Sequence, residues 1–182
     1  MRKLWRKQRL SRLNRDAYSG HAAVHWTMCM ENRATGWLNQ SLHLQVREIL
    51  LHACTRYQVV CPVYVLMPDH GHFLMMGTCT TSDQTLFARF LRTHWNDLLS
   101  ETELQRQAHD HVLRANERTR DVFQTVAAYI LENPVRAGLV KSPIDWPYVG
   151  ACAPGYPSLQ PHRESFWKSY WLAYEALCNR SE

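Results

Sequence analysis

The sequence predicts an α+β protein with a ferredoxin-like fold, in which covering helices pack on an antiparallel four-stranded sheet. Strand-like and helix-like segments follow one another in the order β-α-β-β-α-β, which is typical of that fold. The two middle strands are separated only by Pro68 and Asp69, a tight-turn signal. The six segments comprise residues 21–30, 41–57, 58–67, 70–77, 82–101 and 105–114.

The first three segments alternate between strand and helix patterns. Residues 21–30 are rich in strand formers, and Trp26 alternates with polar neighbours. Residues 41–57 place apolar side chains at helical spacing. Residues 58–67 form an apolar strand that Pro62 interrupts, which predicts an edge position or a bulge.

Three helices are predicted downstream of the hairpin. Residues 82–101 show a helical stripe of apolar side chains, with Ser82 or Asp83 as the N-cap. An extra helix over 117–133 ends near its last residue, because Pro134 disfavours helix in the residue before it. In the C-terminal tail, aromatic residues recur at helical spacing, and we expect a helix docked on the domain. They are Phe166, Trp167, Tyr170, Trp171 and Tyr174.

Length and composition favour one domain with a substantial core. The chain has 182 residues, of which 46% are hydrophobic. No apolar run approaches the roughly 18 residues of a membrane-spanning helix. The six cysteines form no CxxC pair, which argues against a zinc ribbon and suits reduced thiols in the cytosol.

Positive charge is concentrated at the N-terminus. Residues 1–15 carry seven basic side chains and no acid, whereas the whole chain has a formal net charge of +5. Such a basic arm favours a polyanionic partner, nucleic acid before membrane. A solubilising tail is the structural alternative.

The stretch VYVLMPDHGHFLMMG (63–77) contains the chain's most suggestive residue pair. His70 and His72 are two apart in a strand, so both side chains point to one face. They could bind one metal ion, grip one phosphate, or be hydrogen-bonded histidines of the core.

Two residues of the 117–133 helix extend this pattern. Tyr129 and Asn133 are four apart and therefore share a helical face. Alone they suit a packed tyrosine and a residue at the helix end. Together with the histidines, they suggest two imidazoles and an amide oxygen around a metal ion, with a tyrosine nucleophile nearby.

These residues carry a resemblance to a known family. VYVLMPDHGHFLMM is similar to the HUH strand of single-tyrosine transposases of the small insertion-sequence type. AAYILENPVRAGLV (127–140), followed by DWPY (145–148), resembles the hallmark segment of the REP-associated tyrosine transposases. The likeness divides the chain into a basic arm (1–20), an HUH catalytic domain (21–148) and a C-terminal aromatic tail packed on it (149–182).

The resemblance implies an enzyme that nicks and joins single-stranded DNA at hairpins of REP-like palindromes. It implies that His70, His72 and Asn133 bind Mg²⁺ or Mn²⁺, and that Tyr129 attacks the scissile phosphate to give a 5′-phosphotyrosine. Imidazole ligands suit Mn²⁺ better than Mg²⁺, so we expect stronger activity in Mn²⁺. A bacterial cytosolic, nucleoid-associated monomer, rather than a homodimer, is expected.

Two positions depart from or qualify the family pattern. Gly71 stands between the histidines where relatives usually carry a bulky apolar residue, which predicts weaker strand packing. Asp69 is interpreted as a turn residue, with a contact to a metal-binding histidine as the alternative.

Basic side chains are expected to contact DNA phosphates, which gives affinity rather than sequence choice. Trp5 and Trp37 are candidates for base stacking. His109 and His111 form a second HxH pair, interpreted as surface groups rather than as a rival metal site. The DNA-binding candidates are Arg2, Lys3, Arg6, Lys7, Arg114, Arg118 and Arg136.

Two other functions remain open. The chain could be a binding protein of the same ancestry that recognises structured DNA without cutting it. It could also be a metal-dependent phosphodiesterase or RNA-processing protein that uses the histidines with water, and this would not need Tyr129.

Overall fold

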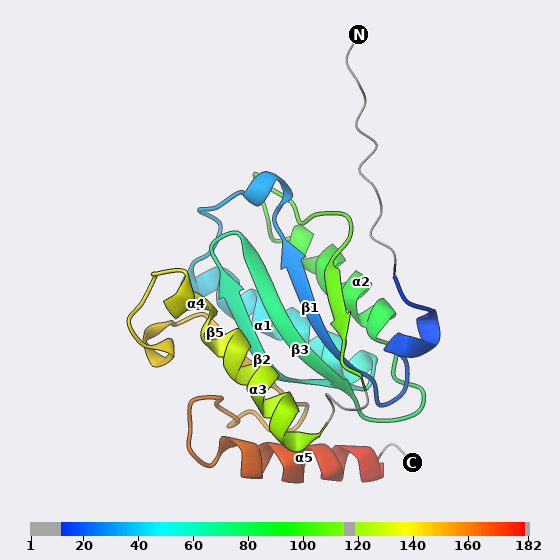
Figure 1. Cartoon of the computed structure of the whole chain (residues 1–182). Coiled ribbons are helices and arrows are strands. Elements are labelled where there is room, and N and C mark those ends of the chain that lie inside the picture. Colours follow the sequence, from blue (N-terminus) through cyan, green and yellow to red (C-terminus); the bar gives the residue numbers. More distant parts are fainter. Residues whose placement is uncertain (1–11, 115–118, 181–182) are drawn as a thin grey trace.

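The computed structural model describes residues 12–114 and 119–180, which form a sheet with helices on both faces (Figure 1). The sheet has five strands in the order β4-β1-β3-β2-β5, and all neighbours are antiparallel. The strands are β1 (Ala23–Cys29), β2 (Val59–Met67), β3 (His70–Gly77), β4 (His109–Val112) and β5 (Val149–Cys152).

The α+β class and the first six elements match the sequence prediction, but the strand number was wrong. The predicted sheet had four strands, and β5 adds a fifth beside β2. It lies in the segment predicted to be tail. β5 is four residues long and contains Gly150 and Ala151, so it has neither the length nor the β-branched content that marks a strand in sequence.

Helices cover the two faces of the sheet unequally. One face carries α1 (Gln40–Arg56) and α2 (Gln84–Asn96), and the opposite face carries α3 (Arg120–Leu131) with α5 (Phe166–Arg180) beside it (Figure 1). The short α4 (Asn133–Arg136) follows α3 directly. Single 3-10 turns are η1 (Arg15–Tyr18), η2 (Glu31–Arg33) and η4 (Pro143–Asp145).

Each face has its own apolar core. On the α1/α2 face, large side chains such as Trp26, Phe73 and Trp95 are fully buried. On the α3 face, Phe123 from α3 and Tyr170 from α5 pack with the aliphatic residues of β2. The aromatic repeat of the tail is therefore the docking face of α5, as predicted.

Gly71 fits closely under the ring of Trp95 on the α1/α2 face. A Cβ at position 71 would lie 2.9 Å from Trp95 Cη2 and 3.0 Å from Phe73 Cε2. The missing side chain thus makes room for a large one from α2. The expectation of weakened strand packing was wrong, since Trp95 fills the space that a bulky residue would take.

Two local features concern Pro62 in β2 and the end of the basic arm. The β2–β3 register shifts between Val60 and Val63, so Pro62 marks a bulge in a central strand rather than an edge. The end of the predicted basic arm is packed on the domain, because Tyr18 is buried and its hydroxyl lies 2.5 Å from a carboxylate oxygen of Asp110.

Candidate functional site

His70 and His72 project from β3 onto the α3 face, at the end of the sheet where the β2–β3 hairpin turns. Their Nε2 atoms lie 3.0 Å apart. Two nitrogens about 2.1 Å from one ion and at right angles to each other would lie roughly this far apart. This is the length of a hydrogen bond between the two rings, and it also equals the spacing of two ligands of one ion.

The second ring nitrogen of His70 is held by Asp69. Nδ1 lies 2.6 Å from Asp69 Oδ1, and Arg33 binds the other carboxylate oxygen at 3.0 Å. Burial raises the pKa of Asp69, but the contacts with His70 and Arg33 outweigh it and lower the pKa overall. The carboxylate accepts a hydrogen bond from Nδ1–H, which leaves the Nε2 lone pair for a ligand. Asp69 is thus a partner of His70 as well as a turn residue.

His72 is fixed in a similar way from β1. Its Nδ1 lies 3.1 Å from both Thr27 Oγ1 and His25 Nε2. Burial lowers the pKa of His72 to about 3, helped by neighbouring positive groups and partly offset by a hydrogen bond with Asn133. His72 is therefore a neutral imidazole at neutral pH, the form that binds metal.

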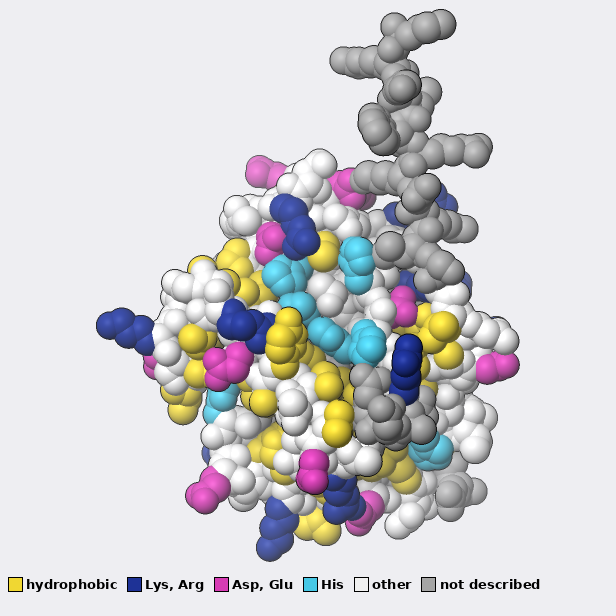
Figure 2. All heavy atoms as spheres, in the orientation of Figure 1, with side chains coloured by type: hydrophobic (Ala, Val, Ile, Leu, Met, Phe, Trp, Pro, Cys, Tyr) yellow, Lys and Arg dark blue, Asp and Glu magenta, His cyan; other side chains and the backbone are white. Residues whose placement is uncertain are grey.

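Histidines extend beyond this pair across the sheet. His72 is in register with Thr27 and His109, and the neighbouring row brings His25 beside His111. Figure 2 shows histidine side chains gathered in a band across this face. Sequence reasoning missed His25, although its position in the strand paired with β3 was a usable signal. His109 and His111 are exposed, as expected for surface groups.

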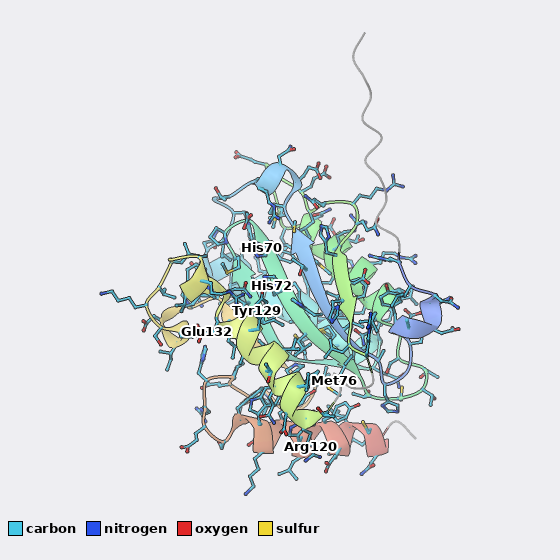
Figure 3. All side chains as sticks on the ribbon, viewed as in Figure 1. His70, His72, Met76, Arg120, Tyr129 and Glu132 are labelled. Atoms are coloured by element: carbon cyan, nitrogen blue, oxygen red, sulfur yellow. The ribbon has the colours of Figure 1, made fainter. Side chains whose placement is uncertain are left out.

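Tyr129 lies near the C-terminal end of α3, the helix that crosses the face of the sheet onto which His70 and His72 project (Figure 3). Its side chain is 58% exposed, whereas Phe123, Ala127 and Ile130 of the same helix are buried. The guanidinium of Arg136 stands 3.7 Å from the centre of the tyrosine ring. The hydroxyl is thus on an accessible side chain whose ring is held against a cation.

Asn133 begins α4, and only Glu132 separates it from the end of α3. Its Nδ2 donates to Ile130 O at 2.9 Å, and its Oδ1 accepts from Arg136 at 2.8 Å. Arg136 also donates to Tyr129 O at 3.0 Å. The amide therefore lies between His72 and Arg136, and Arg136 ties the turn after α3 to the tyrosine.

The residues fit a divalent ion in part. The two Nε2 atoms converge, and the side chains of His70 and His72 are oriented by neighbours. The oxygen of Asn133 would have to exchange its bond with Arg136 for the ion. Within residues 12–114 and 119–180, no group of three His, Cys, Asp or Glu side chains has metal-binding geometry. A site here would depend on an amide oxygen and on oxygens from the substrate.

Only some of the predicted DNA-binding residues lie in the part of the chain that the structure describes. Arg2, Lys3, Arg6, Lys7 and Arg118 lie outside the described residues, as does Trp5. Arg114 is exposed at the end of the β4 segment. Trp37 is only 8% exposed and packs edge-on against Trp95, so its proposed role in base stacking was wrong.

No helix in the described part of the chain has the length and apolar character needed to cross a bilayer. No protein-family profile matches the chain, and no curated protein matches it. Among solved structures, the chain is similar to a REP-associated tyrosine transposase bound to a REP hairpin. The TM-score is 0.64 and the identity 22%, over 77% of this chain and 82% of that one. The two proteins share a fold.

Proposed function

We propose that this protein is a tyrosine transposase, a metal-dependent endonuclease that nicks and joins single-stranded DNA at hairpins of REP-like palindromes. The observation that carries the proposal is the convergence of His70 and His72 Nε2 on the sheet face that α3 covers, where Tyr129 of α3 is accessible. The shared fold with a transposase that was bound to a REP hairpin supports it. On this proposal the chain has a ferredoxin-like core to which β5, α3 and α5 are added.

In the proposed reaction, Tyr129 Oη loses its proton to solvent and forms a bond to the scissile phosphorus. The bond from phosphorus to the 3′ oxygen breaks, and this oxygen takes a proton to become a free 3′-OH. The 5′-phosphotyrosine link is itself a phosphodiester, so the free energy of the broken bond is retained for the joining step. A second 3′-OH then attacks the phosphorus, the strand is joined, and Tyr129 is released without hydrolysis.

His70, His72 and Asn133 would hold Mg²⁺ or Mn²⁺. When bound, the ion would supply polarisation of the phosphate oxygens and stabilisation of the charge that develops on them. Asp69 and Thr27 keep the two imidazoles oriented. Arg136 would leave Asn133 Oδ1 and so become available to a phosphate, while its stack on Tyr129 positions the ring.

The proposed transposase role also implies a DNA partner, an oligomeric state and a cellular location. Arg114, Arg136 and the basic residues of the arm would contact phosphates of hairpin or single-stranded DNA. We propose that the protein acts as a monomer in the bacterial cytosol, associated with the nucleoid. Sedimentation velocity at micromolar concentration, with and without hairpin DNA, measures the first point.

The decisive experiment is a covalent-adduct assay with a labelled hairpin that carries a single-stranded flank, in Mn²⁺. We expect an adduct with the natural chain and none with Tyr129→Phe, while hairpin affinity changes less than about twofold because the ring and its stack on Arg136 remain. Tyr57→Phe, which alters a tyrosine at the far end of α1, is the matched control and should form the adduct.

The other outcomes separate the alternatives. An adduct that persists in Tyr129→Phe would refute the nucleophile. Tight binding without any adduct would favour a non-cutting protein that recognises structured DNA. Cleavage to free ends without an adduct would favour a metal-dependent phosphodiesterase or RNA-processing protein.

A further inference from the structure

A second polar cavity lies at the β5 edge of the sheet, away from Tyr129. It is bounded by α1, by β2 and β5, and by the chain between β5 and α5, and its volume is about 400 Å³. Cavities that bind small molecules have volumes of roughly 300–1,000 Å³. This one is large enough for a compact organic ligand.

The charge in this cavity is entirely positive. Arg47 from α1 and Arg163 from the segment before α5 line it, and none of its lining residues is Asp or Glu. Burial lowers the pKa of His43 and raises the pKa of Tyr64, and the positive charge of Arg47 acts on both groups in the lowering direction. Two guanidinium groups without an acidic partner in the lining favour an anion, and their forked donors suit phosphate.

Two histidines that line the cavity each have a buried ring nitrogen without a hydrogen-bond partner. Nε2 of His43 lies 3.0 Å from the hydroxyl of Tyr64, while its Nδ1 is buried without a hydrogen-bond partner. Nε2 of His162 is buried and unpartnered as well. When the Tyr64 hydroxyl donates to Nε2, His43 carries its proton on Nδ1. Buried polar atoms left unpaired are costly, so both histidines are held beside the cavity at some expense in stability.

The remaining walls are apolar. Ile144, Val149, Pro157 and Leu159 line the cavity beside the basic groups. Gly150 keeps the space around Tyr64 open, since a Cβ there would lie 2.6 Å from the tyrosine oxygen. Basic groups and apolar walls in one cavity suit a phosphate attached to a weakly polar group.

The cavity adjoins the candidate catalytic site through the sheet. Val149 in β5 is in register with Val65 in β2, which is in register with His72 in β3. Two strand spacings amount to about 10 Å. His72 projects onto the α3 face, whereas the α1 wall of the cavity lies on the opposite face with Tyr64, so a strand bound at His72 would reach the cavity around the β5 edge.

We propose that this cavity binds one nucleotide, with its phosphate held by Arg47 and Arg163 and its base against the apolar wall. The ligand is either a free mononucleotide or one unpaired nucleotide of a DNA strand. The binding does not depend on cleavage by Tyr129, so the proposal can fail or succeed apart from the enzymatic one.

The test measures binding by isothermal titration calorimetry in the full-length Tyr129→Phe chain, which keeps DNA intact. One arm uses the four deoxynucleoside monophosphates and inorganic phosphate. The other uses a hairpin with an unpaired flank and the same hairpin without it. In this background, Arg47→Gln and Arg163→Gln are compared with Arg89→Gln, which removes an exposed charge from α2.

We expect Arg47→Gln and Arg163→Gln to weaken nucleotide binding by about tenfold or more, and Arg89→Gln to leave it unchanged. Loss confined to the mononucleotides identifies a free nucleotide as the ligand. Loss confined to the flanked hairpin identifies a nucleotide of the strand. The proposal is overturned if both arginine variants bind every probe as Arg89→Gln does. Thermal unfolding checks that all three variants are folded.

Discussion

At the residue scale, the contact between Asp69 and His70 is the clearest support of the candidate metal site. Partners that orient a metal-binding histidine typically contribute 10–100-fold to metal affinity. We expect Asp69→Ala to weaken Mn²⁺ binding by about that factor, because His70 loses the acceptor that fixes its ring. Titration followed by electron paramagnetic resonance of free Mn²⁺ measures this without reference to activity.

A matched control exists on the surface of α2. His94 and Asp97 form a similar contact of 3.3 Å, but away from the candidate site. Asp97→Ala should leave Mn²⁺ affinity unchanged. Equal affinity in the natural chain and in Asp69→Ala would mean that the carboxylate has no part in metal binding.

Part of this site was predictable from residue spacing. His70 and His72 share a face because strands have a period of two, and Tyr129 and Asn133 come close because helices have a period near four. His25 and Thr27 were not predicted as partners of His72, because their contact depends on the β1–β3 register, which is not local in sequence.

At the element scale, β3 and α2 are coupled through Gly71 and Trp95. Gly71→Ala should destabilise the fold by about 1–3 kcal/mol, since the added carbon meets a buried ring. Trp95→Phe removes part of that ring, so the double variant should lose less stability than the two single losses combined. Urea unfolding followed by circular dichroism gives the four values, and strict additivity would contradict the contact.

The start of α2 provides a pH-dependent prediction. Asp83 is its N-cap, accepts from Thr85 N and Leu86 N, and pairs with Arg15 at 2.6 Å. Burial raises the pKa of Asp83, but these bonds outweigh it and lower the pKa to about 2. The carboxylate therefore stabilises the fold above about pH 4, and this contribution is lost as the pH falls toward 2.

The measurement compares the natural chain with Asp83→Asn, which keeps a capping oxygen but has no charge. At pH 7 the natural chain should be more stable, by at most about 2.5 kcal/mol. Urea unfolding between pH 2 and 7 should show this advantage shrinking below pH 4. A constant difference across that range would exclude the ionised cap as its source.

Element bounds were predictable where periodicity was strong. The predicted helix 41–57 differs by one residue at each end from α1, and the N-cap at Asp83 was one of the two residues proposed. The predicted helix 82–101 was too long, since α2 ends at Asn96. Asn133 belongs to α4 because Pro134 suits the first turn of a new helix.

At the scale of the whole molecule, the uneven charge predicts a strong salt dependence of DNA binding. Replacing Arg2, Lys3, Arg6 and Lys7 with glutamine should reduce the slope of log affinity against log salt by up to about 3, if each contacts a phosphate. The double variant Arg89→Gln/Arg92→Gln on α2 is the control. Fluorescence anisotropy with a labelled hairpin at several salt concentrations gives the slopes, and unchanged slopes would exclude the arm from the interface.

The sheet separates two tasks between its faces. Both faces have an apolar core, and the α3 face also holds the histidine pair and Tyr129. β3 contributes to both faces. His70 and His72 project onto the α3 face, whereas the Cβ position of Gly71 between them faces Trp95 on the α1/α2 face.

This arrangement has an evolutionary consequence. The volume at position 71 and the volume at position 95 fill one space, so they should trade against each other among related sequences. A relative with a bulky residue at 71 should carry a smaller one at 95, while the two histidines stay the same. Gly71 and Trp95 would then have been substituted together. Such a paired substitution leaves unchanged the opposite face, on which the chemistry would occur.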